Sequence, residues 1–205
     1  MKVGILSFQG SFLDHSKSIH ELGYESLLIK QSKDLTSVDA LILPGGESTA
    51  MKKINQFSNL LTDLDQLIKD GIPTLTTCAG TILLAKEVIG GEVTIPNIDI
   101  EVIRNAYGRQ TESFEGSVKF FGNEDIYCFI RAPKISKILS DTVNVIAQHN
   151  DEIVGVAQKN VVSLTFHPEL NNDEYYLNWL NDFIKEGKNV PVILNGLLSK
   201  EKKCK

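Results

Sequence analysis

A cysteine stands where a strand-like run gives way to a helix-like run in TLTTCAGTILLAK, residues 74–86. A side chain on such a strand-to-helix turn is presented above the sheet, as the nucleophiles of many hydrolases are. The N-terminus of a helix favours a thiolate, and its free N–H groups can bind a developing oxyanion. Cys78 is therefore a candidate nucleophile, although a buried structural role is the commoner fate of a lone cysteine.

A candidate base lies far downstream, in His167-Pro168-Glu169. If this segment is extended, residues i and i+2 point the same way. The Glu169 carboxylate could then accept the Nδ1 proton of His167 and orient the ring as a general base. A satisfied core or surface histidine is the alternative.

The remaining histidines have no comparable sequence context, and we assign all three structural roles: His15, His20 and His149. His15 is the least secure of these assignments, because it lies one turn after the predicted strand end at Gln9-Gly10.

The third chemical feature is the segment PGGES, residues 44–48. Its two glycines lack Cβ atoms, so backbone N–H groups there can face a ligand. Ser48 could cap a following helix. Alone, the segment predicts only a tight turn. Together with a cysteine elbow and a His-x-Glu segment, it becomes a candidate oxyanion hole, and the set indicates acyl transfer through a thioester.

These segments fall at the ends of predicted strands. In the first half of the chain strand and helix patterns alternate: strands at Lys2–Ser7, Glu25–Lys30, Ala40–Leu43 and Thr74–Thr77, and helices at Ser11–Leu22, Asn59–Lys69 and Ala79–Val88. From Glu92 onward the runs look mostly antiparallel: Ile98–Ile103, Val118–Phe121, Ile126–Ile130, Val143–Ala147, Ile153–Ala157 and Val161–Phe166. The last of these runs could instead rejoin the parallel sheet, and Asp173–Lys185 predicts a closing helix.

The pattern predicts one α/β domain, with an open, mostly parallel sheet flanked by helices and a mixed or antiparallel β insertion in the second half. Ligands of such sheets bind beyond the carboxyl ends of the strands, where the three chemical segments would meet.

Composition limits the class of function. The 205 residues carry a net charge of −5, which does not suggest a phosphate-binding surface for nucleic acid. No apolar run reaches the roughly 18 residues that a membrane helix needs. The three cysteines show no metal-ligand spacing and no even disulfide set, so a reduced, cytoplasmic environment is the simplest expectation.

Together these residues resemble a class I glutamine amidotransferase domain, which has a flavodoxin-like fold. The chain is more closely similar to the glutaminase subunit of pyridoxal 5′-phosphate synthase. That narrower resemblance is carried, between residues 5 and 170, by ILSFQGSFLDH, LPGGEST, TCAGTILLAKEV, IRNAYGRQTESFEG, FIRAP and FHPEL. The fourth and fifth segments discriminate against the glutaminases of histidine, purine and anthranilate synthesis.

The resemblance implies roles for individual residues. Cys78 would be the nucleophile, His167 the base and Glu169 its orienting partner, while the N–H groups of Gly46 and Ala79 would form the oxyanion hole. The positions that match the family's glutamine-binding residues are Gly46, Glu47, Ser48, Arg104, Ile130 and Arg131. For the two arginines, structural ion pairs are the alternative. Gln9 matches a family residue near the oxyanion hole, at the contact with the synthase subunit.

The implied reaction is hydrolysis of L-glutamine to L-glutamate and ammonia. The ammonia would pass to a separate (β/α)₈ pyridoxal 5′-phosphate synthase subunit in a hetero-oligomer, and the chain would be poorly active until that subunit binds. We expect no metal and no cofactor in this chain, and no nucleic-acid or membrane partner. Residues 1–189 would form the amidotransferase domain, with 190–205 as a tail of unknown role.

One residue departs from the family pattern: Thr76 stands where the family usually has glycine. A β-branched residue adds bulk at an elbow and does not readily take a positive φ. Thr76 is the only support for an alternative reading, a catalytically degenerate subunit kept for assembly. A cysteine hydrolase or chaperone-like protein of the broader superfamily is a further alternative, although PGGES with HPE is not expected there.

Overall fold

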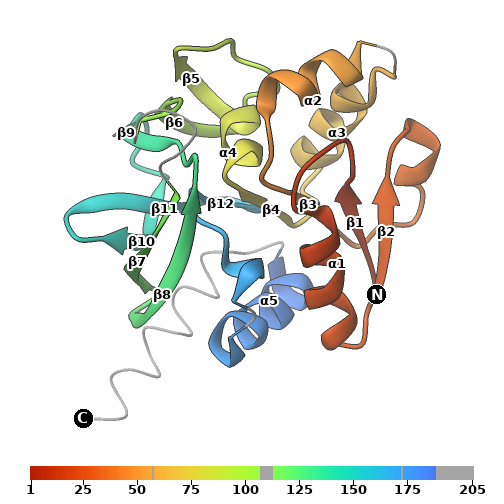
Figure 1. Cartoon of the computed structure of the whole chain (residues 1–205). Helices are drawn as coiled ribbons and strands as arrows, with labels where there is room; N and C mark the ends of the chain where they lie inside the picture. The colour runs from red at the N-terminus through yellow and green to blue at the C-terminus, as the bar shows by residue number, and fades with distance from the viewer. Residues whose placement is uncertain (57, 107–112, 172, 188–205) are drawn as a thin grey trace.

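The computed structural model describes residues 1–56, 58–106, 113–171 and 173–187. Its main feature is one mixed, nine-stranded sheet with the strand order β2-β1-β3-β4-β12-β11-β10-β7-β8 (Figure 1). Five strands form its parallel half: β1 (Lys2–Leu6), β2 (Glu25–Ile29), β3 (Ala40–Leu43), β4 (Thr74–Thr77) and β12 (Val161–Leu164). The others continue the sheet in antiparallel pairs: β11 (Glu152–Gln158), β10 (Asn144–His149), β7 (Ser113–Phe120) and β8 (Asn123–Ile130).

The helices lie on both faces of the sheet, as predicted (Figure 1). They are α1 (Phe12–Glu21), α2 (Ser48–Asn55), α3 (Leu60–Lys69), α4 (Ala79–Leu84) and α5 (Glu174–Glu186), with short 3₁₀ turns η1 (Ser32–Leu35) and η2 (Pro168–Leu170). Two hydrophobic clusters account for this arrangement. One joins α1 and α5 to the sheet, and the other joins α2, α3 and α4 to the opposite face. No helix in these ranges is long and apolar enough to cross a membrane.

The helix predicted over Ala79–Val88 is wrong in its second half. The helix α4 ends at Leu84, and Ala85–Ile89 forms strand β5 of a separate three-stranded sheet with β6 (Ile98–Ile103) and β9 (Lys134–Ile138). Burial explains the change, because α4 is buried along its whole length whereas Lys86 and Glu87 are exposed beside β6. Tertiary pairing has overridden local helix propensity here. The strand β9 was not predicted.

The run Val161–Phe166 does rejoin the parallel sheet. Its strand β12 pairs parallel with β4, with Ser163 opposite Thr76, and antiparallel with β11. The antiparallel strands β7, β8, β10 and β11 therefore extend the same sheet, whereas β6 and β9 belong to the separate three-stranded sheet. Because β12 and β4 are parallel neighbours, the segment that follows β12 lies beside the segment that follows β4. The predicted tail, 190–205, lies outside the described residues.

Candidate active site

The turn at Cys78 has a backbone conformation that is unusual for any residue other than glycine. Between β4 and α4, Cys78 has φ 45° and ψ −104°. Such conformations cost about 1–3 kcal/mol and persist where the surroundings hold them. Here the Cys78 N–H donates to the Leu164 carbonyl of β12 at 2.9 Å. The thiol is 3% exposed, and its Sγ lies 3.5 Å from the Ile130 carbonyl oxygen at the end of β8.

The turn also lies very close to β3. A Cβ atom on Gly80 would come within 2.1 Å of the Leu43 carbonyl oxygen, so this position needs glycine. The following helix has only six residues. Helix α4 is thus too short for a large dipole, and it can stabilise a thiolate or an oxyanion mainly through the backbone N–H groups of its first turn.

His167 and Glu169 are in direct contact. The Nδ1 atom of the ring lies 2.8 Å from Oε1 of the carboxylate, and both side chains are buried. The predicted pairing is present, but the predicted reason for it is wrong. Pro168–Leu170 is a 3₁₀ turn and not an extended segment, because proline is well suited to the first position of a helical turn. The turn curls the carboxylate back toward the ring.

The charge state of this pair is set by opposing effects. Burial favours neutral imidazole, but the Glu169 charge, together with Cys78, raises the pKa of His167 well above its ordinary value. Burial likewise favours a protonated carboxyl, yet His15 and His167 lower the pKa of Glu169 well below its ordinary value. The geometry therefore favours an anionic carboxylate that stabilises an imidazolium. The ring Nε2 is buried and makes no hydrogen bond within the described residues, so it remains for the thiol and substrate.

His15 belongs to this cluster: it is a core histidine with polar partners, as predicted, but it lies against the candidate pair. It is fully buried, with Nε2 3.4 Å from Glu169 Oε1 and 3.2 Å from Thr77 Oγ1. Ser11 donates from Oγ to the same Glu169 oxygen at 2.7 Å. The sequence signal was the position of His15 one turn after Gln9-Gly10. Nothing in the sequence singled out Ser11 or Thr77.

The PGGES segment crosses the site beside these residues. A Cβ atom on Gly45 would lie 2.3 Å from Cε1 of His167, so the loop can pass the ring only because Gly45 is glycine. The Gly45 N–H donates to Thr77 Oγ1 at 3.0 Å, and its carbonyl accepts from the Ser11 N–H at 3.1 Å. The candidate oxyanion donors, the N–H groups of Gly46 and Ala79, have no hydrogen-bond acceptor within the described residues.

Helix α2 is capped by Glu47. The sequence had suggested Ser48 as the cap. The Glu47 carboxylate accepts from the N–H groups of Thr49 and Ala50 at 2.9 and 2.8 Å. Ser48 is buried. The Glu47 N–H donates to the side-chain oxygen of Gln9 at 2.6 Å, which places Gln9 against the PGGES loop.

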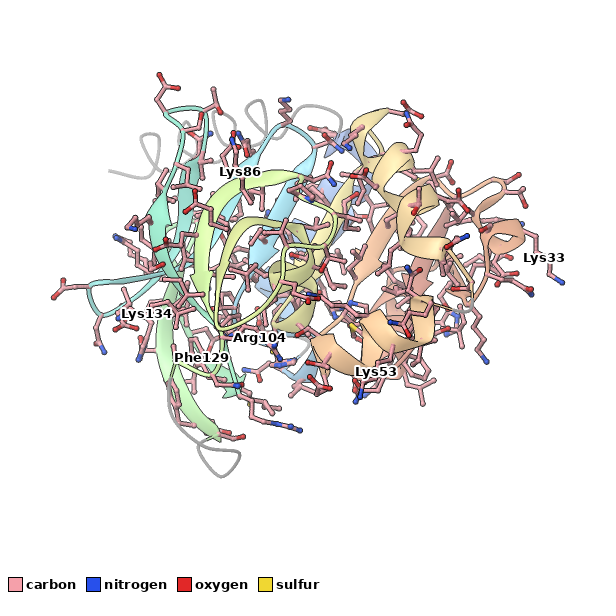
Figure 2. All side chains as sticks on the ribbon, turned by 90° about the horizontal axis from the view of Figure 1, so that it is seen from above. Lys33, Lys53, Lys86, Arg104, Phe129 and Lys134 are labelled. Carbon is pink, nitrogen blue, oxygen red and sulfur yellow. The ribbon has the colours of Figure 1, made fainter. Side chains whose placement is uncertain are left out.

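The two arginines differ in their surroundings. Arg104 lies between the strands of the second half and helix α2, which carries Lys53 (Figure 2). Its guanidinium donates to Thr49 Oγ1 at 3.1 Å and reaches the Glu47 carboxylate at 3.5 Å. Arg131 is exposed and follows Ile130 with φ 48°. The structure thus places Arg104 beside the PGGES loop, and Arg131 next to the carbonyl that faces Cys78.

Thr76 is accommodated without distortion. It is fully buried in β4, pairs in register with Leu43 and Ser163, and is not among the residues with positive φ. Its Oγ1 lies 2.9 Å from Ser163 Oγ and 3.0 Å from Thr81 Oγ1. The positive φ falls on Cys78 instead. The Thr76 hydroxyl therefore forms a cluster with two others, those of Thr81 and Ser163, below the elbow.

Comparison with known proteins shows the family of the chain. The model of the SNO glutamine amidotransferase family matches residues 5–187. The chain belongs to this family. A subunit PdxT of pyridoxal 5′-phosphate synthase from Geobacillus thermodenitrificans is 41% identical, over 94% of this chain and 100% of its own. The subunit PdxT from Methanocaldococcus jannaschii is 45% identical, over 85% of this chain and 93% of its own.

Solved structures give the same fold. A glutamine amidotransferase crystal structure covers 87% of this chain and 98% of its own, with a TM-score of 0.79 and 35% identity. The PurLQS structure from Thermotoga maritima covers 96% of this chain and 98% of the matched chain, with a TM-score of 0.66 at 16% identity, and supports the fold alone. Within the described part of this SNO-family chain, no group of three or more His, Cys, Asp or Glu side chains could hold a metal ion.

Proposed function

We propose that this chain is the glutaminase subunit of a pyridoxal 5′-phosphate synthase, with Cys78, His167 and Glu169 as its catalytic residues. The observation that carries the site assignment is the buried contact of 2.8 Å between His167 and Glu169, close to a cysteine held at φ 45°. The activity follows from membership of a glutamine amidotransferase family. The pathway follows from relatives that bear the name of that synthase subunit.

The chemistry needs only these groups and water. The Cys78 thiol gives its proton to Nε2 of His167, and its sulfur then forms a bond with the carboxamide carbon of glutamine. The tetrahedral oxyanion is bound by the N–H groups of Gly46 and Ala79. When the C–N bond breaks, His167 returns the proton to the departing ammonia, which leaves a γ-glutamyl thioester.

Water completes the cycle. His167 removes a proton from water as the water oxygen attacks the thioester carbon. The C–S bond then breaks, the sulfur recovers its proton from His167, and L-glutamate leaves. Glu169 holds the ring and stabilises its charged form in both halves of the reaction.

The glutamine would lie between the PGGES loop and the end of β8. Backbone groups of Gly46 and Ile130, with Glu47 and Ser48, would contact its polar ends, and Arg104 complements a carboxylate. Arg131 would contribute from the position after Ile130. In this structure Arg104 is 3.5 Å from Glu47, so an ion pair and substrate binding are competing uses of the same guanidinium.

The partner would be a (β/α)₈ synthase subunit that uses the ammonia in a hetero-oligomer, with Gln9 at the contact. Gln9 is exposed and bonded to the loop that contains Gly46, so a subunit that binds there can act on the oxyanion hole. A cytoplasmic location suits a nucleophile that must stay reduced. We also propose that residues 1–189 form the catalytic domain. The degenerate alternative depended on Thr76, which leaves the elbow intact.

The decisive experiment measures glutamate release from L-glutamine, with and without a cognate synthase subunit. We expect release with the subunit and little without it. No release in either case, from a chain that binds the subunit, would contradict a catalytic role and favour the degenerate alternative.

A further inference from the structure

Behind the catalytic pair, a closed ring of polar contacts links Glu169 to the PGGES loop. From Glu169 Oε1 it runs to His15 Nε2 at 3.4 Å, and from there to Thr77 Oγ1 at 3.2 Å. Thr77 Oγ1 accepts the Gly45 N–H at 3.0 Å, and the Gly45 carbonyl accepts the Ser11 N–H at 3.1 Å. Ser11 Oγ closes the ring on Glu169 Oε1 at 2.7 Å.

The contacts fix which nitrogen of His15 carries hydrogen. Nε2 faces two oxygens, one of them on a carboxylate whose anionic form the site favours. A bare Nε2 would place its lone pair against that charge, so the surroundings assign the hydrogen to Nε2. His15 is then a donor shared between the Glu169 carboxylate and the Thr77 hydroxyl.

The position of the Glu169 carboxylate is set by the groups that contact its Oε1 atom. Oε1 receives Ser11, His15 and His167, whereas Oε2 is buried without a hydrogen-bond partner in the described ranges. The PGGES loop also contacts the candidate base, since Gly45 lies directly against the imidazole of His167. One buried imidazole thus connects the group that orients the base with the backbone next to Gly46.

We propose that His15 is a positioning residue for the reaction, which holds the Glu169 carboxylate against His167 and ties it through Thr77 to the PGGES loop. The role rests on the proposed function for its effect on turnover. It does not touch the substrate. Its contribution is to keep the base and the oxyanion donors in register, and small displacements of such groups cost rate.

The test compares two substitutions of similar size. His15→Gln keeps an N–H donor near the position of Nε2, whereas His15→Leu removes it. Turnover is measured as glutamate release in the complex with the synthase subunit. We expect His15→Leu to lower kcat roughly tenfold or more, with a smaller change in KM, and His15→Gln to recover most of the loss. His20→Leu is the matched control, since His20 lies exposed on the same helix.

A second measurement is independent of turnover. Iodoacetamide alkylation of Cys78, followed by mass spectrometry of its peptide, compares the rates near pH 7 and near pH 10. A well-placed Glu169 favours the thiolate–imidazolium pair, so His15→Leu should lower the ratio of the neutral rate to the alkaline rate, and His15→Gln should not. If the wild-type complex releases no glutamate, the proposed function fails, while this ratio still tests His15.

The proposal is overturned if His15→Leu keeps wild-type kcat and alkylation ratio, or if His15→Gln loses as much as His15→Leu. Thermal unfolding shows whether each variant folds. Should His15→Leu not fold, His15→Asn takes its place, because its amide is polar but too short to reach the carboxylate, and the same loss is expected.

Discussion

The two sides of the candidate site are built differently. On the reacting side, His15, His167 and Glu169 are at most 4% exposed, and both imidazole rings contact the same oxygen of the Glu169 carboxylate. On the binding side, Gly46 and Arg131 are exposed, and Arg104 reaches Glu47 only at 3.5 Å. The groups proposed to move protons are fixed in advance, while Gly46 and Arg131, which are expected to hold glutamine, remain accessible.

This contrast indicates which groups of the site need fixed positions and which need access to solvent. A base and its orienting carboxylate must be placed within fractions of an ångström, which packing and hydrogen bonds achieve only in the interior. Recognition groups must admit a substrate and, in the proposed complex, respond to a partner. Substitutions on the reacting side should therefore change kcat, and those on the binding side should change KM.

The largest effect is expected at the nucleophile. Cys78→Ala should reduce glutamate release by roughly 10⁴-fold or more, because Cys78 is the group proposed to form the thioester. Binding to the synthase subunit should be unchanged, which gel filtration of the mixed subunits can measure. Ammonia release by a folded Cys78→Ala chain would refute the assignment.

The next prediction separates the two members of the pair. His167→Ala should cost more rate than Glu169→Gln, by roughly tenfold or more, because the base transfers protons whereas the carboxylate only orients and stabilises it. Single-turnover kinetics with glutamine report both losses. His149→Ala is the control, since that ring bonds to the Ser117 carbonyl away from the pair. Equal and negligible losses would argue against the triad.

A smaller effect is expected on the binding side. Arg104→Gln should raise KM for glutamine about tenfold with less change in kcat, as expected for loss of one charge-assisted hydrogen bond. Steady-state kinetics of the complex measure this, with Lys53→Gln on neighbouring α2 as the control. If Arg104 serves only the ion pair with Glu47, KM will stay constant, and the contrast between the two sides loses its support.

The smallest effect on rate is expected below the elbow. Thr76→Gly removes a buried side chain and two hydroxyl contacts, and it adds backbone freedom to a strand. Unfolding in urea should show a loss of about 2 kcal/mol, while turnover stays within about threefold of wild type. A variant as stable as the wild type would mean that the hydroxyl cluster contributes nothing to folding.

The sequence predicted the parts of the site that depend on local pattern. Cys78 was singled out because a strand, a cysteine and small residues follow one another. His167 and Glu169 were paired because residues i and i+2 of an extended segment point the same way, whereas the structure brings them together by a 3₁₀ turn. The helix over Ala79–Val88 was predicted too long because its outcome depends on β6, which lies in a distant part of the chain. Periodicity reports burial on one element and not the identity of the neighbour.

His15 shows the other limit. Its residue type and its position on α1 did not indicate a role in catalysis, since a histidine on the apolar face of a helix is most often part of the core. Its function could be inferred only when the fold set α1 beside η2, which brings together residues 154 positions apart in the chain. Ser11 and Thr77, ordinary polar residues in sequence, acquire roles in the same way.

The order of the strands has a consequence for synthesis of the protein. Among the described residues β12 is the last strand, yet it lies in the middle of the sheet, between β4 and β11. A nascent chain that has already released Cys78 from the ribosome still lacks the strand that holds the elbow and the turn that carries the base. Such long-range pairing forms late. The chain is thus expected to gain its hydrolytic activity only as its final elements emerge, which keeps incomplete chains from consuming glutamine.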